Sequence, residues 1–135
     1  MSTRARVGIK NEDGTIRSIY THWDGYPSNN GKILVKSYDT PAKINKLMDF
    51  GDCSVLDHTL VFEGVDPVTH ESKGCEFYKR DRGETGTDAI IHSGYDDFKD
   101  YAEEWVYLFK DGKWYAMGWD IKVLTELKDE ILEIG

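Results

Sequence analysis

One stretch of the sequence decides the class of fold: Val106-Tyr107-Leu108-Phe109-Lys110-Asp111-Gly112-Lys113-Trp114-Tyr115-Ala116-Met117. Two apolar, aromatic-rich runs flank an Asp-Gly pair, which suits the positive backbone angles of a tight β-hairpin turn. The stretch is therefore predicted to be a hairpin. A second hairpin is predicted at the N-terminus, with alternating apolar and polar residues over 3–9, a turn at Asp13-Gly14 and a strand over 16–23.

Helices are predicted where apolar residues recur at helical spacing. The clearest one is capped by Thr40, has Pro41 in its first turn and ends at Gly51. Ser28 can cap another, which runs to about Tyr38. The remaining predicted elements are helices at about 96–105 and 123–131, and short strands at 59–63 and 75–79.

The predicted order is therefore ββ, αα, ββ, α, ββ, α. Hairpins without regular βαβ alternation favour an α+β fold, with a mainly antiparallel sheet and about four helices packed on it. The chain has 135 residues, of which 39% are apolar, so residues 1–135 are expected to form a single globular domain.

The balance of charge excludes some classes of partner. The net charge of −8 argues against general nucleic-acid binding and against binding to an anionic membrane, because both need a broad basic field. DNA mimicry by carboxylates is a weaker reading, since the acids are interleaved with lysines. No apolar run approaches the roughly 20 residues that span a bilayer. With no signal peptide recognised, Cys53 and Cys75 are expected to be free thiols in the cytoplasm.

The first polar motif is His22-Trp23-Asp24-Gly25-Tyr26-Pro27, followed by Ser28-Asn29-Asn30-Gly31-Lys32. It lies where a strand gives way to a helix, and helix starts gather backbone N–H groups that bind anions. Trp23 and Tyr26 could stack on a planar base, and Asp24 could accept hydrogen bonds from it. The alternative is a structural corner in which Trp23 is buried, Asp24 and Gly25 form the turn and Ser28 caps the helix.

The second motif is Arg80-Asp81-Arg82-Gly83-Glu84-Thr85-Gly86-Thr87. Four of the five arginines form two pairs with i, i+2 spacing, Arg4/Arg6 and Arg80/Arg82. In a strand this spacing places both guanidinium groups of a pair on one face, where they suit phosphate or carboxylate. The alternative is a solvated hairpin end with surface ion pairs. The loop is not a Walker motif.

Catalytic readings have less support in the sequence. The four histidines show no HxxxH or HExxH spacing, so no metal site is predicted. Asp57 with Glu71-Ser72-Lys73 is a faint match to the acid and ExK elements of metal-dependent nucleases. Asp57-His58 could also join His22 or His70 in space. No catalytic residue and no cofactor are assigned, and enzymatic activity stays open but disfavoured.

The chain resembles a family of small uncharacterised proteins encoded by bacteriophages and prophages. The resemblance rests on the motifs above and on three further stretches: Ser2-Thr3-Arg4-Ala5-Arg6, Gly51-Asp52-Cys53-Ser54-Val55-Leu56 and Tyr107 to Tyr115. It implies a phage accessory protein in the host bacterial cytoplasm. Small phage accessory proteins are often counter-defence factors, and one class of these sequesters nucleotide signals made by host immune systems.

The resulting hypothesis is an anti-defence sponge that binds a small anionic, nucleotide-like immune signal without cleaving it. A homodimer is compatible with this role, because small sponges often build sites between two chains. The alternatives are a protein-binding inhibitor of a host defence enzyme and a hydrolase of a phosphorylated signal, with His22 or Glu84 as acid or base. The expected ligand-binding residues are Arg4, Arg6, His22, Trp23, Asp24, Tyr26, Asn30, Arg80, Arg82, Glu84, Thr85 and Thr87.

Overall fold

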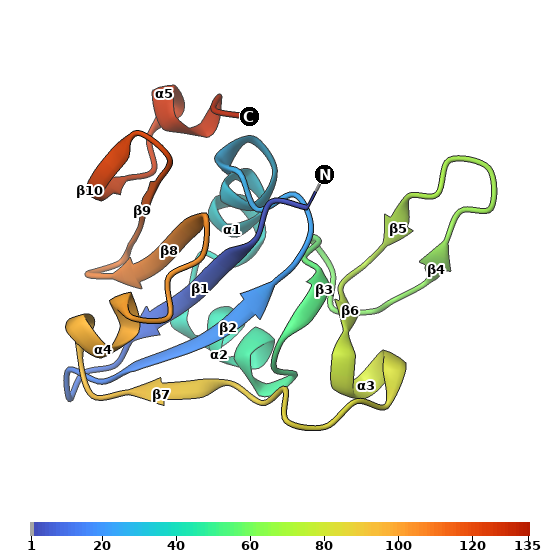
Figure 1. The fold of residues 1–135 in the computed structure, drawn as a ribbon, viewed down its shortest axis with the longest axis horizontal. Coiled ribbons are helices and arrows are strands. Elements are labelled where there is room, and N and C mark those ends of the chain that lie inside the picture. Colours follow the sequence, from blue (N-terminus) through green and yellow to red (C-terminus); the bar gives the residue numbers. More distant parts are fainter. Residues whose placement is uncertain (1) are drawn as a thin grey trace.

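An eight-stranded sheet forms the centre of the molecule (Figure 1). The computed structural model describes residues 2–135, and at Ser72 it describes the backbone only. The strand order is β10-β9-β8-β1-β2-β3-β6, and β7 pairs with β2 off this path. These strands are β1 (Ala5–Lys10), β2 (Ile16–Thr21), β3 (Cys53–Val55), β6 (Glu76–Phe77), β7 (Ile90–His92), β8 (Trp105–Lys110), β9 (Lys113–Gly118) and β10 (Ile121–Glu126). A separate two-stranded ribbon, β4 (Gly64–Val65) with β5 (Ser72–Lys73), projects from the body. Together with the segments that lead to and from it, it forms an arm over residues 59–74.

The predicted α+β class is confirmed, and the sheet is mainly antiparallel. The hairpins β1–β2 and β8–β9 are antiparallel and in full register. The turn of the second hairpin places Asp111 and Gly112 at φ angles of 52° and 77°, as a tight Asp-Gly hairpin turn requires. Only two neighbouring pairs in this path are parallel, β1 with β8 and β2 with β3. The sheet is therefore built mostly from local hairpins joined side by side.

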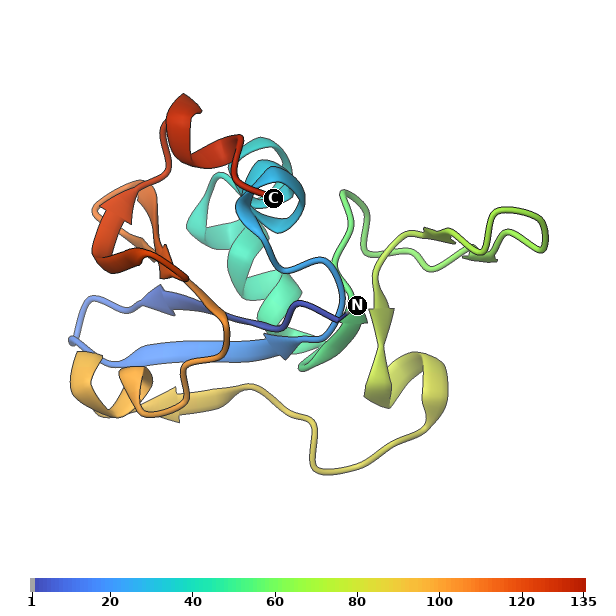
Figure 2. The same cartoon turned by 45° about the horizontal axis from the view of Figure 1, so that its top comes forward.

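Helices cover both faces of the sheet (Figure 2), with α1 and α2 on one side and α4 on the other. The helical elements are a π-helical turn η1 (Pro27–Gly31), α1 (Lys32–Ser37), α2 (Pro41–Asp49), α3 (Tyr78–Arg82), α4 (Tyr95–Lys99) and α5 (Asp129–Leu132). The Thr40 hydroxyl accepts a hydrogen bond from the backbone N–H of Lys43, which confirms the predicted cap of α2. Ser28 lies inside η1 and does not cap it, which corrects that detail.

The two faces of the sheet carry separate apolar clusters. On the α1 and α2 side, alternate residues of β1 pack with both helices around the buried Trp105, Tyr107 and Phe77. Both cysteines are free and buried in this cluster, and burial raises the pKa of each thiol. On the α4 side, a smaller cluster surrounds the fully buried Phe98.

Gly8 makes room for Phe98 on the α4 side of β1. A Cβ atom at Gly8 would lie 2.8 Å from Phe98 Cε1 and 3.1 Å from Ile16 Cγ2. Gly8→Ala is therefore expected to lower the free energy of unfolding by about 1–3 kcal/mol, through overpacking. Urea denaturation measures this loss. In a Phe98→Leu background the same change should cost less, and an equal cost in both backgrounds would contradict the assigned contact.

Two predicted strands in the middle of the chain need correction. Residues 59–63 do not form a strand. Backbone hydrogen bonds link this segment to residues 73–75 at only two points, Glu63 N to Lys73 O and Cys75 N to Thr59 O. Gly74, at φ 85°, passes so close to the Val61 carbonyl that a side chain would not fit, and the chain bends there. The predicted strand at 75–79 is reduced to the two residues of β6, after which α3 begins.

Two predicted helices are also wrong over most of their length. The helix predicted over 96–105 ends at Lys99, because Trp105 is buried in β8 between Ala5 of β1 and Gly118 of β9. The segment predicted as a helix over 123–131 is β10 followed by the short α5. Here β9 offers a free edge, and the alternating β-branched residues of β10 suit pairing with it. Within residues 2–135, no helix is long and apolar enough to cross a membrane.

Candidate functional site

A sharp backbone corner follows β2 and presents Trp23 to solvent. The N–H groups of His22 and Trp23 donate to Cys53 O and Ser54 O, which holds the corner against β3. Asp24 has a positive φ of 55°, and the Gly25 N–H donates to Thr3 O at 2.7 Å. Trp23 is 42% exposed, so the reading of a corner with a buried tryptophan is wrong.

Two further residues of the first motif, Tyr26 and Asn30, stabilise the corner. Asn30 is fully buried and donates to Thr21 Oγ1 at 2.9 Å. The Tyr26 hydroxyl donates to Asp24 Oδ1 at 3.2 Å, and the Tyr26 ring packs against the C-terminal Gly135. Neither Tyr26 nor Asn30 lines the cavity described below. Both residues therefore stabilise the backbone conformation of the corner.

Arg82 comes from α3 and approaches the corner from the other side. Its Nη2 donates to Ser54 Oγ and to Glu76 Oε1, each at 3.2 Å, and its guanidinium lies 5.2 Å from the centre of the Tyr78 ring. The hydrogen bond to Glu76 raises the pKa of Arg82. Within the described chain these bonds use Nη2 alone, so Nε and Nη1 of Arg82 are available to a ligand.

Arg80 does not join Arg82, because both belong to a helix and not to a strand. Positions i and i+2 of a helix point in nearly opposite directions. The Arg80 guanidinium pairs with Asp81, donates to Cys75 O and lies 5.0 Å from the rings of Phe50 and Phe77. Arg80 therefore fastens α3 to the core, and the prediction that both guanidinium groups share one face is wrong.

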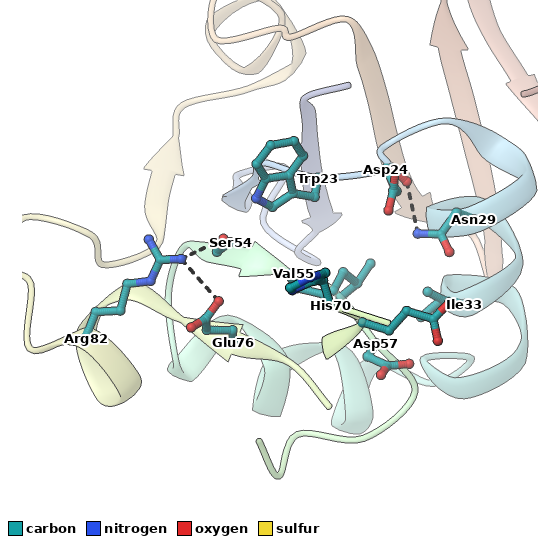
Figure 3. Close-up of a pocket in the computed structure, with 12 residues that line it drawn as sticks. Trp23, Asp24, Asn29, Ile33, Ser54, Val55, Asp57, His70, Glu76 and Arg82 are labelled. Carbon is teal, nitrogen blue, oxygen red and sulfur yellow. Dashed lines mark hydrogen bonds and ion pairs between the residues drawn. The ribbon is translucent and has the colours of Figure 1, made fainter. Parts of the chain in front are cut away.

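Trp23 and Arg82 lie on two sides of an open cavity of about 610 Å³ (Figure 3). The arm, β3, β6, α1 and the corner after β2 all contribute to its walls. The lining residues are Trp23, Asp24, Asn29, Ile33, Ser54, Val55, Leu56, Asp57, His70, Glu71, Glu76 and Arg82. The structure thus brings together three of the predicted ligand-binding residues, Trp23, Asp24 and Arg82.

Carboxylates dominate the charge of this cavity. Four of its lining residues are acidic, whereas Arg82 is the one lysine or arginine among them. Both oxygens of Asp57 are used within the protein, by the N–H groups of His58 and Gly74. The other three carboxylates, Asp24, Glu71 and Glu76, each keep at least one oxygen without a hydrogen bond from the described chain. The cavity therefore offers several carboxylate oxygens as free acceptors.

The predicted residues of the N-terminal arginine pair lie elsewhere. Arg4 forms exposed ion pairs with Glu103 and Glu104, at 3.8 Å and 3.7 Å. Arg6 is buried, donates from Nε to Tyr101 O at 3.4 Å and lies 5.7 Å from the centre of the Tyr101 ring. Burial lowers the pKa of Arg6, and nearby acids oppose this effect. Neither arginine lines the cavity.

His22 and the loop after α3 also lie outside the lining. His22 Nδ1 is hydrogen-bonded to the Tyr20 hydroxyl at 2.7 Å, and its ring packs edge-on against Trp23. Glu84 and Thr85 are exposed, and the Thr87 carbonyl accepts from the Asp52 N–H at 2.7 Å. The Asp52 carboxylate in turn accepts from the Tyr20 N–H, and burial raises its pKa. His22 thus packs against Trp23, and Thr87 is bound to Asp52, directly before β3.

Several lining residues were not among the expected ligand-binding residues. Asn29 lies in η1, Ser54 and Val55 in β3, Leu56 directly after β3, and His70 at the tip of the arm. The sequence pointed to the first four only as parts of longer motifs, and to His70 only as a possible neighbour of Asp57-His58. Asp57 and Glu71, which match the nuclease pattern faintly, both line the cavity. Within residues 2–135, however, no group of three or more histidine, cysteine, aspartate or glutamate side chains is placed to hold a metal ion.

A buried histidine on the α4 side of the sheet is expected to make stability depend on pH. His92 is fully buried, with Nε2 2.6 Å from Ser18 Oγ and Nδ1 3.7 Å from Asp97 Oδ2. Burial lowers the pKa of His92, an effect that Asp97 opposes and Arg6 reinforces. Below about pH 6.5, the unfolded chain therefore binds a proton that the folded chain resists.

Stability is thus expected to fall as the pH drops from about 6.5, by at most about 1.4 kcal/mol per pH unit from this group. Urea denaturation of the wild type and of His92→Gln between about pH 5 and pH 7.5 isolates the contribution. The difference in unfolding free energy between the two proteins should narrow or reverse toward the acid end of this range. A difference that stays constant with pH would contradict the assignment.

Comparisons of the chain with models of known protein families, with curated proteins and with solved structures found no match.

Proposed function

We propose that this protein binds a nucleotide-like ligand in the Trp23–Arg82 cavity and sequesters it without cleaving it. The observation that carries the proposal is the placement of an exposed indole ring and an arginine with free donors on two sides of one cavity. A base can stack on Trp23, since aromatic side chains contribute about 1–3 kcal/mol per stacked base. An anionic group can pair with the free Nε and Nη1 of Arg82.

The biological setting of the proposal comes from the resemblance to phage and prophage proteins. A small phage protein that retains a nucleotide-like immune signal would act by lowering the concentration of free signal in the host cytoplasm. Such a role needs tight binding and no turnover. The residues considered as acid or base for a hydrolase, His22 and Glu84, do not line the cavity, so binding has better support than hydrolysis.

Trp23→Ala tests the proposal most directly. The variant is expected to lose about tenfold or more in affinity for adenosine monophosphate, measured by isothermal titration calorimetry, because the stacking surface is removed. Trp119→Ala is the matched control, since Trp119 is 47% exposed and lies outside the cavity lining. Mass spectrometry of the recovered ligand should find it intact. Equal losses in both variants, or a hydrolysed ligand, would contradict the proposal.

A protein-binding inhibitor is the second candidate, and the arm favours it. The arm extends away from the body (Figures 1 and 2) and exposes Val61, Val65 and Val68, at 65%, 51% and 83%. Exposed apolar side chains on a projecting ribbon are suited to contact with another protein. Val65→Lys with Val68→Lys would abolish inhibition of a host enzyme under this candidate, and would leave ligand binding unchanged under the main proposal.

A further inference from the structure

Several hydrogen-bond acceptors around the cavity have no partner in the described chain. Asn29 uses both amide hydrogens within the protein, on Asp24 O and Asn30 Oδ1, so only its oxygen remains for a ligand. One oxygen of Asp24 and one of Glu76 have no partner in the described chain. The Glu71 side chain, on the arm, has no hydrogen bond to the described residues. A ligand that fits this wall has to supply the donors.

The charges in the cavity also limit the charge of its ligand. Asp24, Asp57, Glu71 and Glu76 together outweigh Arg82, and the side chain of Arg82 already pairs with Glu76. One anionic group can accept hydrogen bonds from the two free nitrogen atoms of Arg82. Each further anionic group would face carboxylates, and like charges at close range repel strongly. The cavity therefore opposes a polyphosphate chain.

We infer that the ligand is an aminopurine with no more than one phosphate group, an inference that rests on the proposed nucleotide-binding function. The base stacks on Trp23, and its exocyclic amino group donates to the carboxylate of Glu71, neither of whose oxygens has a hydrogen-bond partner in the described chain. The single phosphate pairs with Arg82. The carboxylates determine the specificity of the site. They accept hydrogen bonds from the amino group, and they repel a ring carbonyl in its place and any additional phosphate. A site built to accept hydrogen bonds rejects an analogue that lacks the donor.

Isothermal titration calorimetry of the full chain in magnesium-free buffer tests the inference with four probes: AMP, GMP, IMP and ATP. IMP lacks the amino groups of both AMP and GMP. It differs from GMP by the amino group alone, and from AMP by a C6 carbonyl and an N1–H in place of the C6 amino group and the unprotonated N1. At least one of AMP and GMP should bind tenfold or more tightly than IMP, and AMP should bind tenfold or more tightly than ATP. IMP binding as tightly as both aminopurines, or ATP binding as tightly as AMP, overturns the inference.

Glu71→Gln then separates the role of the carboxylate from that of the arm. The amide keeps the shape of the side chain but can donate a hydrogen bond and carries no charge. The preference for AMP over ATP, and the preference over IMP of whichever aminopurine binds more tightly, should therefore each shrink severalfold. Glu63→Gln is the matched control, because Glu63 is an exposed carboxylate of the same arm outside the cavity lining. Unchanged preferences in Glu71→Gln, or equal changes in both variants, overturn the assigned role.

The design also distinguishes the inference from the function on which it rests. If none of the four nucleotides binds, the proposed function and the inference both fail. If the nucleotides bind and Trp23→Ala weakens them, but the order of affinities does not follow amino groups and phosphate number, the proposed function stands and the inference alone is overturned.

Discussion

Arg82→Glu is expected to weaken the binding of AMP by at least about a hundredfold. Among the residues that the structure describes, Arg82 is the one arginine or lysine that lines the cavity, and its free Nε and Nη1 are the donors assigned to the phosphate. A hydrogen bond to a charged group contributes about 1.5–3 kcal/mol, and each factor of ten in affinity corresponds to about 1.4 kcal/mol. The new carboxylate would also repel the phosphate, which adds to the loss.

The fold should tolerate this variant at a modest cost in stability. The Arg82 side chain is 43% exposed, but that of Glu76 is only 14% exposed and would lose its partner and face a second carboxylate, so the free energy of unfolding should fall by about 1–3 kcal/mol. Arg82→Lys keeps the charge but loses the fork geometry, so an intermediate loss of affinity is expected. Arg17→Glu is the control at an exposed ion pair of similar length, with Asp49 at 2.8 Å. Equal affinity losses for Arg17→Glu and Arg82→Glu would point to the total charge of the protein and not to the cavity.

Local sequence patterns predicted those elements whose partners are close in the chain. The β8–β9 hairpin and α2 are set by a turn or a cap and by side chains within a few residues, so periodicity was sufficient. The prediction of a helix over residues 123–131 was wrong for residues 123–126, because the conformation of these residues depends on a strand that lies beside them. The free edge of β9 provides hydrogen-bond partners for β10, and no pattern inside the segment reveals that edge.

The candidate site was predictable only where chemistry stands out in a short motif. Trp23, Asp24 and Arg82 were expected from their motifs, and the structure brings them to one cavity. Arg80 was misplaced because the orientation of an i, i+2 pair depends on whether the segment is a strand or a helix. Glu71 and His70 reach the cavity because the arm runs out and back between β3 and β6. No local sequence pattern near residues 70–71 indicates this position, because it depends on segments that are distant in the chain.

Gly25→Ala is expected to lower the free energy of unfolding by about 2–4 kcal/mol, through overpacking and strained hydrogen bonds, and to weaken ligand binding as well. A Cβ atom at Gly25 would lie 2.6 Å from Thr3 O and 2.9 Å from Ala5 Cβ, and both atoms belong to the N-terminal stretch that leads into the centre of the sheet. Overpacking of this kind costs about 1–3 kcal/mol. The backbone cannot move away without straining two hydrogen bonds, Gly25 N to Thr3 O and the Tyr107 hydroxyl to Gly25 O, each worth about 0.5–1.5 kcal/mol.

Urea denaturation measures this loss in the free energy of unfolding, with Gly94→Ala as the control. A Cβ atom at Gly94 would meet no other atom within 4 Å, and the φ of 178° there is extended, so this change should stay within about 0.5 kcal/mol. Trp23 and Asp24 directly precede Gly25, so a displaced corner moves both away from Arg82. The folded fraction of Gly25→Ala should therefore also bind AMP more weakly than the wild type. Wild-type stability in Gly25→Ala would show that the corner tolerates a side chain there, and that the position of Trp23 does not depend on close packing against β1.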